Sequence, residues 1–234
     1  MENQFLRTEM LLGKDAINIL KASRVAIFGI GGVGGYTLEA LVRSGIGTID
    51  IIDNDTVGET NLNRQIVALH STMDMYKVDA AEIRAKDINK NVIINKHKIF
   101  YTAENKSEFD FSKYDYVIDA IDTVSSKISL IEECRKNNTP IICAMGAGNK
   151  LDATKFLIAD ISKTTVCPLA RTIRQELKKR NIKNVKVVFS TEKPIKPTET
   201  TEQSFKRQIP GSNAICPAVM GLLIAQEVIK SIIN

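Results

Sequence analysis

The segment Arg24-Val-Ala-Ile-Phe-Gly-Ile-Gly-Gly-Val-Gly34 decides the fold, because a short apolar run leads directly into a cluster of glycines. The apolar run is typical of a buried strand, and an amphipathic helix pattern follows the glycines. The next apolar run, Ile49-Asp-Ile-Ile-Asp53, is a second strand that ends in an acid. Strand, glycine-rich turn, helix and strand make a βαβ unit, which predicts parallel strands.

The same unit predicts a ribonucleotide site. Its glycines, Gly29, Gly31, Gly32 and Gly34, permit a tight turn and a close approach of phosphate to the backbone N–H groups that open the helix. Asp53 ends the second strand, where a carboxylate can accept hydrogen bonds from ribose hydroxyls.

The alternation of strands and helices continues, and it predicts an α/β fold with a doubly wound, mainly parallel, Rossmann-like sheet. Up to residue 148 the expected elements are helices over 5–20, 77–89 and 125–136 and strands over 92–97, 116–120 and 139–143. After it they are strands over 155–159 and 185–190, a basic helix over 169–180, a mobile loop over 192–203 and an apolar helix from Pro217. We expect one domain with an N-terminal helix, a nucleotide-binding core over 1–150 and a C-terminal basic α/β extension over 151–234, which binds substrate and forms dimer contacts.

Composition excludes several classes of protein. Hydrophobic residues make up 44% and charged residues 25% of the 234, as in soluble globular proteins. We see no apolar run near about 18 residues and no signal peptide, so we expect no membrane span and a cytoplasmic location. The four cysteines, which form no CxxC pair, are Cys134, Cys143, Cys167 and Cys216. A zinc site made of paired CxxC knuckles is therefore excluded, and we expect no zinc.

The positive charge of the chain is concentrated in one segment. Residues 151–211 hold 13 Lys and Arg against 6 Asp and Glu, whereas the remainder holds 19 against 21. We define the basic tract as Arg171, Arg174, Lys178, Lys179, Arg180, Lys183 and Lys186. Such asymmetry indicates a polyanionic partner, and the alternative is a solvated helix face that only keeps the protein soluble.

Three further features bear on which nucleotide binds. Asn61-Leu-Asn63-Arg64-Gln65 follows the ribose acid, Lys77 opens the next helix, and Asp122 follows the strand over 116–120. Arg and Lys suit a triphosphate, and a carboxylate at the carboxyl edge of a sheet suits magnesium. These features favour ATP, and the alternative from fold alone is a dinucleotide dehydrogenase.

The spacing of these motifs resembles that of the ubiquitin-activating-like adenylating superfamily over residues 4–148. The resemblance implies ATP with magnesium, adenylation of a carboxylate and release of pyrophosphate. It implies a nucleotide site made of Gly29, Gly31, Gly32, Gly34, Asp53, Asp55, Asn61, Arg64, Lys77 and Asp122. In it Asp53 holds the ribose, while Asn61, Arg64 and Lys77 contact phosphates. Asp122 carries the magnesium.

The resemblance also implies a homodimer. Arg7 matches an arginine that, in this superfamily, reaches into the site of the other subunit. The implied catalytic residues are therefore Arg7, Arg64, Lys77 and Asp122. Attack on the α-phosphate builds negative charge, which these cationic side chains and magnesium would neutralise.

The second half narrows the resemblance to the tRNA threonylcarbamoyladenosine dehydratases. Pro168-Leu-Ala-Arg171, Val188-Phe-Ser-Thr-Glu192 and Ile209-Pro-Gly-Ser212 carry that likeness. It implies adenylation of the threonyl carboxylate of a modified adenosine in tRNA, after which the carbamoyl nitrogen closes a ring and expels AMP. The basic tract would then grip the phosphate backbone of tRNA. A cysteine desulfurase or sulfur-acceptor system is a further partner that the resemblance implies.

Two departures and two alternatives remain at this point. Cys167 stands where many relatives have an acid, and Val67 where many have a histidine. The first alternative is adenylation of the C-terminal glycine of a ubiquitin-like sulfur carrier, and the second is a nucleotide-sensing protein without turnover. We assign no catalytic cysteine, and we interpret His70 and His97 as structural.

Overall fold

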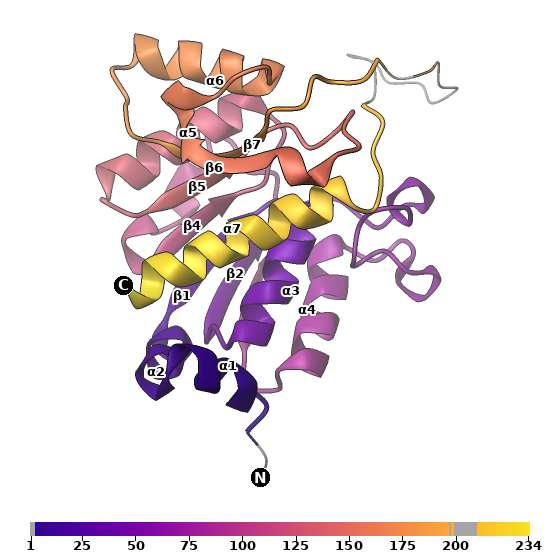
Figure 1. Cartoon of the computed structure of the whole chain (residues 1–234). Helices are drawn as coiled ribbons and strands as arrows, with labels where there is room; N and C mark the ends of the chain where they lie inside the picture. The colour runs from indigo at the N-terminus through magenta and orange to yellow at the C-terminus, as the bar shows by residue number, and fades with distance from the viewer. Residues whose placement is uncertain (1–2, 197, 199–209) are drawn as a thin grey trace.

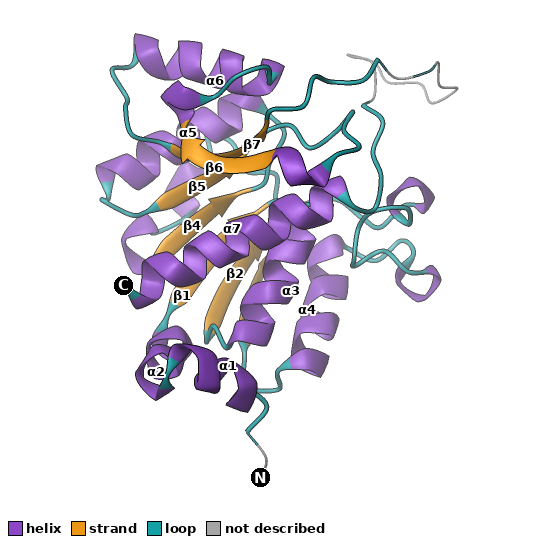
Figure 2. Cartoon of the chain, in the orientation of Figure 1, coloured by secondary structure: helices purple, strands orange, loops and turns teal. Residues whose placement is uncertain are grey.

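The computed structural model describes residues 3–196, 198 and 210–234. Its strands are β1 Arg24–Phe28, β2 Thr48–Ile52, β3 Ile93–His97, β4 Tyr116–Asp119, β5 Ile141–Ala144, β6 Phe156–Asp160 and β7 Lys186–Ser190. Its α-helices are α1 Leu6–Leu12, α2 Lys14–Ala22, α3 Gly34–Ser44, α4 Lys77–Ile88, α5 Val124–Lys136, α6 Pro168–Lys179 and α7 Cys216–Ile233. The predicted α/β fold is confirmed (Figure 2).

The strands form one sheet in the order β3-β2-β1-β4-β5-β7-β6. All neighbouring strands are parallel except β6 and β7, which are antiparallel. The order reverses between β1 and β4, and this reversal is the point at which open parallel sheets bind ligands. Because β6 and β7 belong to the same sheet as β1–β5, the segment after residue 150 extends the sheet that the first half of the chain forms.

Helices cover both faces of the sheet (Figure 1). On one face α2, α3, α4 and α7 bury Leu41, Ile51 and Ile224 in the largest apolar cluster. On the other face α5 and α6 pack near β5 and β7, and aromatic side chains from residues 101–114 pack around Phe28. The inner strands β1, β2, β4, β5 and β7 are therefore buried on both sides, as their continuous apolar pattern predicts. The edge strands β3 and β6 are only partly buried.

The helix α7 crosses the sheet beside α3 (Figure 1). The crossing is close, because the Thr37 hydroxyl donates to the Gly221 carbonyl at 3.0 Å and a Cβ at Gly221 would lie 2.4 Å from the Val33 oxygen. By length and composition α7 is apolar enough to cross a membrane, so the expectation that no segment reaches that length was wrong. Its buried side chains, including Met220 and Val228, pack in the core as those of soluble proteins do.

The predicted single N-terminal helix over 5–20 is wrong, because the chain forms two helices, α1 and α2. Gly13 separates them with φ of +88°, a left-handed conformation that ends the first helix. Phe5 packs over Gly45 at the end of α3, so α1 lies at the amino edge of the sheet. The expected loop over 192–203 lies largely outside the described residues, and its described part, 192–196 and 198, contains no helix or strand.

Candidate active site

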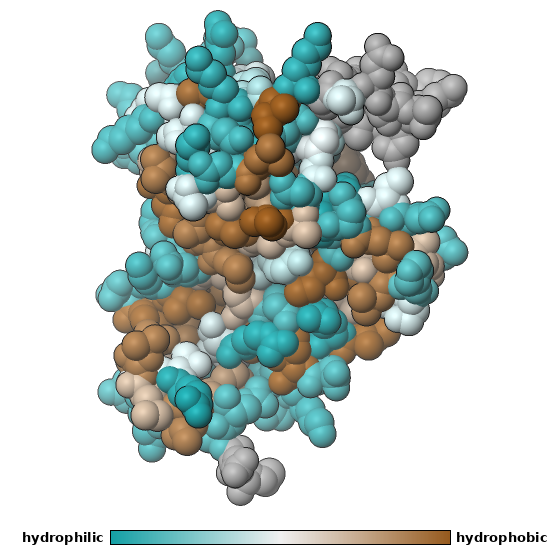
Figure 3. All heavy atoms as spheres, turned by 45° about the vertical axis from the view of Figure 1, so that its right-hand side comes forward, coloured by the Kyte–Doolittle hydropathy of each residue, from teal (hydrophilic) through white to brown (hydrophobic). Residues whose placement is uncertain are grey.

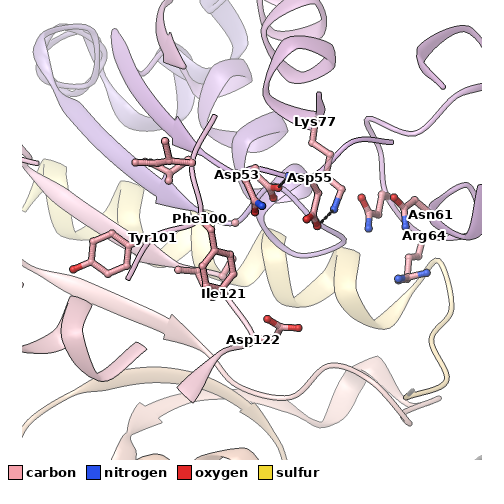
Figure 4. Close-up of a pocket in the computed structure, with 16 residues that line it drawn as sticks. Asp53, Asp55, Asn61, Arg64, Lys77, Phe100, Tyr101, Ile121 and Asp122 are labelled. Atoms are coloured by element: carbon pink, nitrogen blue, oxygen red, sulfur yellow. Dashed lines mark hydrogen bonds and ion pairs between the residues drawn. The ribbon is translucent and has the colours of Figure 1, made fainter. Parts of the chain in front are cut away.

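A cavity of about 340 Å³ opens at the carboxyl ends of β1, β2 and β4 (Figure 4). Its lining residues are Gly29, Gly31, Ile52, Asp53, Asn54, Asp55, Asn61, Arg64, Gln65, Lys77, Ile99, Phe100, Tyr101, Ala120, Ile121 and Asp122. Parallel strands bring these residues together although the chain separates them by up to 93 positions, from Gly29 to Asp122. The cavity lies at the topological reversal of the sheet.

Two of the four predicted glycines are required by backbone geometry. Gly29 has φ of +93°, and a Cβ there would lie 2.7 Å from the carbonyl oxygen of Ala120. A Cβ at Gly34 would lie 1.8 Å from the Gly29 oxygen. Gly31 lines the cavity with open space beside it, whereas Gly32 faces Pro217 of α7. Gly29 and Gly31 therefore line the cavity. Gly32 and Gly34 lie outside it, where they let the turn pack closely against α7 and against the Gly29 carbonyl.

Asp53 is fixed at the floor of the cavity by backbone donors. The Ile30 N–H donates to its Oδ2 at 2.7 Å, and the Asp55 N–H donates to its Oδ1 at 2.9 Å. Burial raises the pKa of Asp53, while the Lys77 ammonium lowers it. The carboxylate thus faces the glycine turn, and each oxygen retains capacity to accept a hydroxyl.

Lys77 is held by an ion pair. Its Nζ lies 2.7 Å from Asp55 Oδ2, and the Lys77 side chain is 7% exposed while that of Asp55 is 62% exposed. The Lys77 N–H also donates to the Asp55 carbonyl at 2.9 Å. This double connection fixes the first turn of α4 against the loop after β2, so the ammonium points into the cavity (Figure 4).

The segment after η1 Glu59–Asn61 supplies amide and guanidinium groups. Asn61 Oδ1 accepts from the Gly58 N–H at 3.1 Å, which fixes this side chain. One guanidinium nitrogen of Arg64 donates to Thr60 O at 2.7 Å and to Asn63 Oδ1 at 2.9 Å. Its other nitrogens make no hydrogen bond within the described part of the chain, so they are available to an anion.

Asp122 faces these cations from the opposite wall (Figure 4). It is an exposed residue of the loop between β4 and α5, and its only hydrogen bond within residues 3–196, 198 and 210–234 comes from the Thr123 hydroxyl at 3.4 Å. The cavity therefore combines a carboxylate on one side with Lys77 and Arg64 on the other.

Several lining residues escaped the sequence interpretation. Ile52, Ile99, Phe100 and Ile121 form an apolar wall, which suits a planar base. Gln65, which belongs to the motif over 61–65 but was given no role from the sequence, is buried, and its Oε1 has no hydrogen-bond partner among the described residues. Residues 99–101 could have been predicted to line the cavity from their position just after β3. The carboxyl end of β3 lies at the same edge of the sheet as the carboxyl end of β2.

Arg7 does not line the cavity of its own chain. It lies on α1, at the amino edge of the sheet and away from the carboxyl ends (Figure 1). No residue of α1 is buried within the chain, and Leu6, Met10 and Leu11 are 55%, 81% and 82% exposed. Within one chain Arg7 therefore cannot act at the cavity, and only a second chain could receive it there.

The basic tract extends across the sheet. α6 begins beside Gly146, near the carboxyl edge, whereas Lys186 opens β7 at the amino edge. Part of its charge is already paired: Lys179 with Glu176, Arg180 with Glu176 and Glu132, and Lys186 with Glu227. Arg174 donates to the Thr164 carbonyl at 2.9 Å. Arg171, Lys178 and Lys183 form no ion pair among the described residues, so only part of the tract has unpaired charge to offer a ligand.

The cysteines and histidines lie outside the cavity. All four thiols are buried and free, and burial raises the pKa of Cys134, Cys143 and Cys216. His97 Nε2, at the end of β3, lies 3.3 Å from Asp50 Oδ1 on the neighbouring strand β2. Within the described part of the chain, no three His, Cys, Asp or Glu side chains are arranged around a shared metal position.

Comparison with known proteins gives a consistent result. The model of the ThiF family matches residues 5–234. The tRNA threonylcarbamoyladenosine dehydratase of Bacillus subtilis is 43% identical over 100% of this chain and 96% of its own length. The tRNA threonylcarbamoyladenosine dehydratase of Haemophilus influenzae is 37% identical over 94% of this chain and 87% of its own length.

A solved structure agrees over almost the whole chain. It is the crystal structure of Escherichia coli tRNA N6-threonylcarbamoyladenosine dehydratase in complex with ATP, with a TM-score of 0.89 and 34% identity. The match covers 98% of this chain and 93% of the other. The similarity therefore extends through residues 151–234 and is not confined to the first 150 residues.

Proposed function

Because the chain belongs to the ThiF family, and within it to the tRNA threonylcarbamoyladenosine dehydratases, we propose that it uses ATP to cyclise threonylcarbamoyladenosine in tRNA. The observation that carries this proposal is the convergence of Asp53, Arg64, Lys77 and Asp122 on one cavity. A hydride-transferring dehydrogenase has no use for that arrangement of charges.

ATP occupies the cavity in this proposal. The base lies on the apolar wall that includes Ile99 and Ile121, and the ribose hydroxyls donate to Asp53. The phosphates lie toward Gly31 and the N-terminus of α3, whose oriented N–H groups favour an anion. Asn61, Arg64 and Lys77 contact the phosphates, and Asp55 positions Lys77 through their ion pair.

Asp122 fits a magnesium ion that arrives with ATP. Mg²⁺ is usually held by one or two carboxylates together with phosphate oxygens and water, so a single exposed carboxylate is sufficient. When bound, the ion withdraws charge from the phosphates. The protein would supply Asp122 as the ligand and Arg64 and Lys77 as the opposing cations.

The first chemical step is adenylation. A carboxylate oxygen of the threonyl group attacks the α-phosphorus, and the bond from that phosphorus to the bridging oxygen breaks. Pyrophosphate leaves with the electron pair. Arg64 and Lys77 stabilise the negative charge that gathers on the phosphoryl oxygens, so catalysis depends on positioning and electrostatics.

The second step closes the ring. The carbamoyl nitrogen of the same nucleoside attacks the activated carbonyl carbon and loses its proton, and AMP leaves with the electron pair of the broken C–O bond. Both reacting groups belong to one substrate, so no covalent enzyme intermediate is needed. Burial and the raised pKa of Cys134, Cys143 and Cys216 keep these thiols out of the reaction.

We place the active enzyme as a homodimer in which Arg7 reaches the cavity of the partner. The exposed apolar side chains Leu6, Met10 and Leu11 on α1 suit a second chain. Figure 3 shows further apolar areas among hydrophilic side chains, and the exposed residues Leu157, Ile215 and Leu222 extend the available apolar surface.

The basic tract binds the phosphate backbone of tRNA, and we place the chain in the cytoplasm with that substrate. Arg171, Lys178 and Lys183 supply the unpaired charge. They give affinity and salt dependence, while contacts specific to the modified base come from other residues, near the ATP cavity.

The test is AMP formation from ATP with three substrates offered separately. These are tRNA bearing threonylcarbamoyladenosine, the same tRNA without the modification, and a ubiquitin-like sulfur carrier ending in glycine. The proposal predicts AMP only with the modified tRNA. AMP formation with the carrier alone would replace it by sulfur-carrier activation, and ATP binding without turnover on any of the three would make the chain a nucleotide-binding protein.

A further inference from the structure

We infer that the buried ion pair between Lys127 and Asp119 positions the loop that carries Asp122. Neither partner lines the cavity, and both side chains are 0% exposed. Lys127 Nζ lies 2.9 Å from Asp119 Oδ1, and it also donates to the Ala144 carbonyl at 2.7 Å. One ammonium thus connects the last residues of β4 and β5 to the first turns of α5.

The pair spans the loop of interest. Asp119 ends β4 and Val124 begins α5, so only residues 120–123 lie between them. The Ile121 N–H donates to Asp119 Oδ1 at 3.2 Å, which fixes the first bend of this loop. Lys127 connects both ends of the loop, and the loop holds Asp122 toward the cavity. Asp122 itself is exposed and makes one weak hydrogen bond to the residues that the structure describes.

The same loop forms a wall of the nucleotide site. The Ala120 N–H donates to the Phe28 carbonyl at 2.8 Å, and the Ala120 oxygen would lie only 2.7 Å from a Cβ at Gly29. A shift of residues 120–123 would therefore move both the Asp122 carboxylate and the surface against which the glycine turn packs. Asp119 and Lys127 are positioning residues, which act through Asp122 and Ala120.

A structural role alone predicts something different. Burying a Lys–Asp pair is costly, and apolar side chains of the same shape often give equal or better stability. If the pair only filled the core, removing both charges together would leave ATP binding and turnover intact. The ion pair between Arg24 and Asp50 serves as a control, because it also contains a buried Asp. It lies away from the cavity, since Arg24 is the first residue of β1 and the cavity is at the carboxyl ends of the strands.

The experiment compares the double variants Asp119→Asn/Lys127→Met and Arg24→Met/Asp50→Asn. ATP affinity is measured by calorimetry without tRNA, so this part stays interpretable if modified tRNA proves not to be the substrate. Turnover at saturating ATP is measured with modified tRNA and rests on the proposed function. We expect the first variant to lose about 10- to 100-fold in turnover and to bind ATP more weakly, and the control to change neither.

A mutant cycle with Asp122→Ala separates positioning from general damage. If the pair acts through Asp122, adding Asp122→Ala to Asp119→Asn/Lys127→Met costs little more turnover than the pair variant already lost. Independent losses that multiply, or turnover near that of the unmodified chain, would overturn the inference. Should the double variant fail to fold, the same cycle with Asp119→Asn alone decides, because Asn keeps the acceptor for Ile121 and Lys127 but removes the charge.

Discussion

The cavity that we propose for ATP and the basic tract are built in opposite ways. The cavity gathers side chains from distant parts of the sequence, but each follows a strand end or opens a helix, so the sheet brings Asp53, Lys77 and Asp122 together. The tract is nearly continuous in sequence, yet it extends from one edge of the sheet to the other and pairs with Glu132, Glu176 and Glu227. Position at a strand end is therefore a better guide to a site than closeness in the sequence.

The largest expected effect is at the cavity. Asp122→Ala and Arg64→Ala should each fold normally, because both side chains face the cavity and neither is fully buried. Each substitution removes a contact that stabilises charge in the transition state. The loss of transition-state stabilisation is typically ~2.7–4 kcal/mol, which lowers turnover roughly a hundred- to a thousandfold. AMP release with modified tRNA measures the loss. Glu104→Ala, an exposed acid outside the cavity, serves as the control and should stay at the original rate.

The role that we propose for Arg7 provides the next test, because it would make the cavity depend on a second chain. Arg7→Ala and Asp122→Ala should each be nearly inactive alone. Mixed in equal amounts and allowed to exchange subunits, they should regain about a quarter of full activity, since half the dimers are hybrids with one intact site each. A monomer by light scattering at the assay concentration would contradict this account, as would a mixture no more active than its components.

The basic tract should give a smaller and salt-dependent effect. Lys178→Gln with Lys183→Gln removes two charges that form no ion pair among the described residues. We expect weaker tRNA binding and a shallower salt slope, because fewer counterions are released on binding. ATP affinity should not change, since neither residue lines the ATP cavity.

A matched pair of substitutions sharpens that comparison. Lys179→Gln with Arg180→Gln also removes two charges from the tract, but both side chains already pair with Glu176. This variant should weaken tRNA binding less than the first. Equal effects would mean that net charge alone decides, and no effect in either variant at several salt concentrations would place tRNA elsewhere on the surface.

The smallest effect concerns Asp50 of β2, which contacts Arg24 of β1 and Asn95 and His97 of β3. Burial opposes ionisation of Asp50, but hydrogen bonds from His97, Arg24 and Asn95 outweigh it and lower the pKa of Asp50 from 3.8 to about 2. A depressed carboxylate pKa stabilises the folded state above about pH 4, and this contribution is lost as the pH falls toward 2. The shift corresponds to roughly 2 kcal/mol.

Urea unfolding of Asp50→Asn across this range measures the contribution. The stability difference from the unmodified chain should be largest above pH 4 and should narrow toward pH 2. A difference that stays constant with pH would mean that Asp50 titrates alike in the folded and unfolded states.

The sequence predicted what depends on regular patterns. Apolar runs predicted all seven observed strands. The pattern is clearest for inner strands such as β1 and β4, since a strand buried on both faces must be apolar throughout. Gly29, Asp53, Lys77 and Asp122 were predicted because strand ends and helix starts fix their positions. The sequence did not predict the break at Gly13. The apolar side chains of α1 have the spacing of an amphipathic helix that continues into α2, although they are exposed within the chain.

Other features depend on tertiary packing that no local pattern encodes. Phe100 and Tyr101 follow β3 in an irregular segment, and only the arrangement of β3 beside β2 brings them to the cavity. Lys186 of β7 forms an ion pair with Glu227 of α7, 41 residues later in the chain. The sequence alone therefore suggested more unpaired positive charge in the basic tract than the structure has. The buried contact of Lys127 with Asp119 is likewise invisible in composition, because a lysine is ordinarily exposed.

The most direct test of the central claim is nucleoside mass spectrometry of tRNA after incubation with the protein and ATP. We predict that threonylcarbamoyladenosine disappears and that a nucleoside lighter by one water takes its place, in an amount equal to the AMP released. The Asp122→Ala variant should leave the nucleoside unchanged. Threonylcarbamoyladenosine that stays intact with the unmodified chain, while ATP is bound or consumed, would contradict the proposed function.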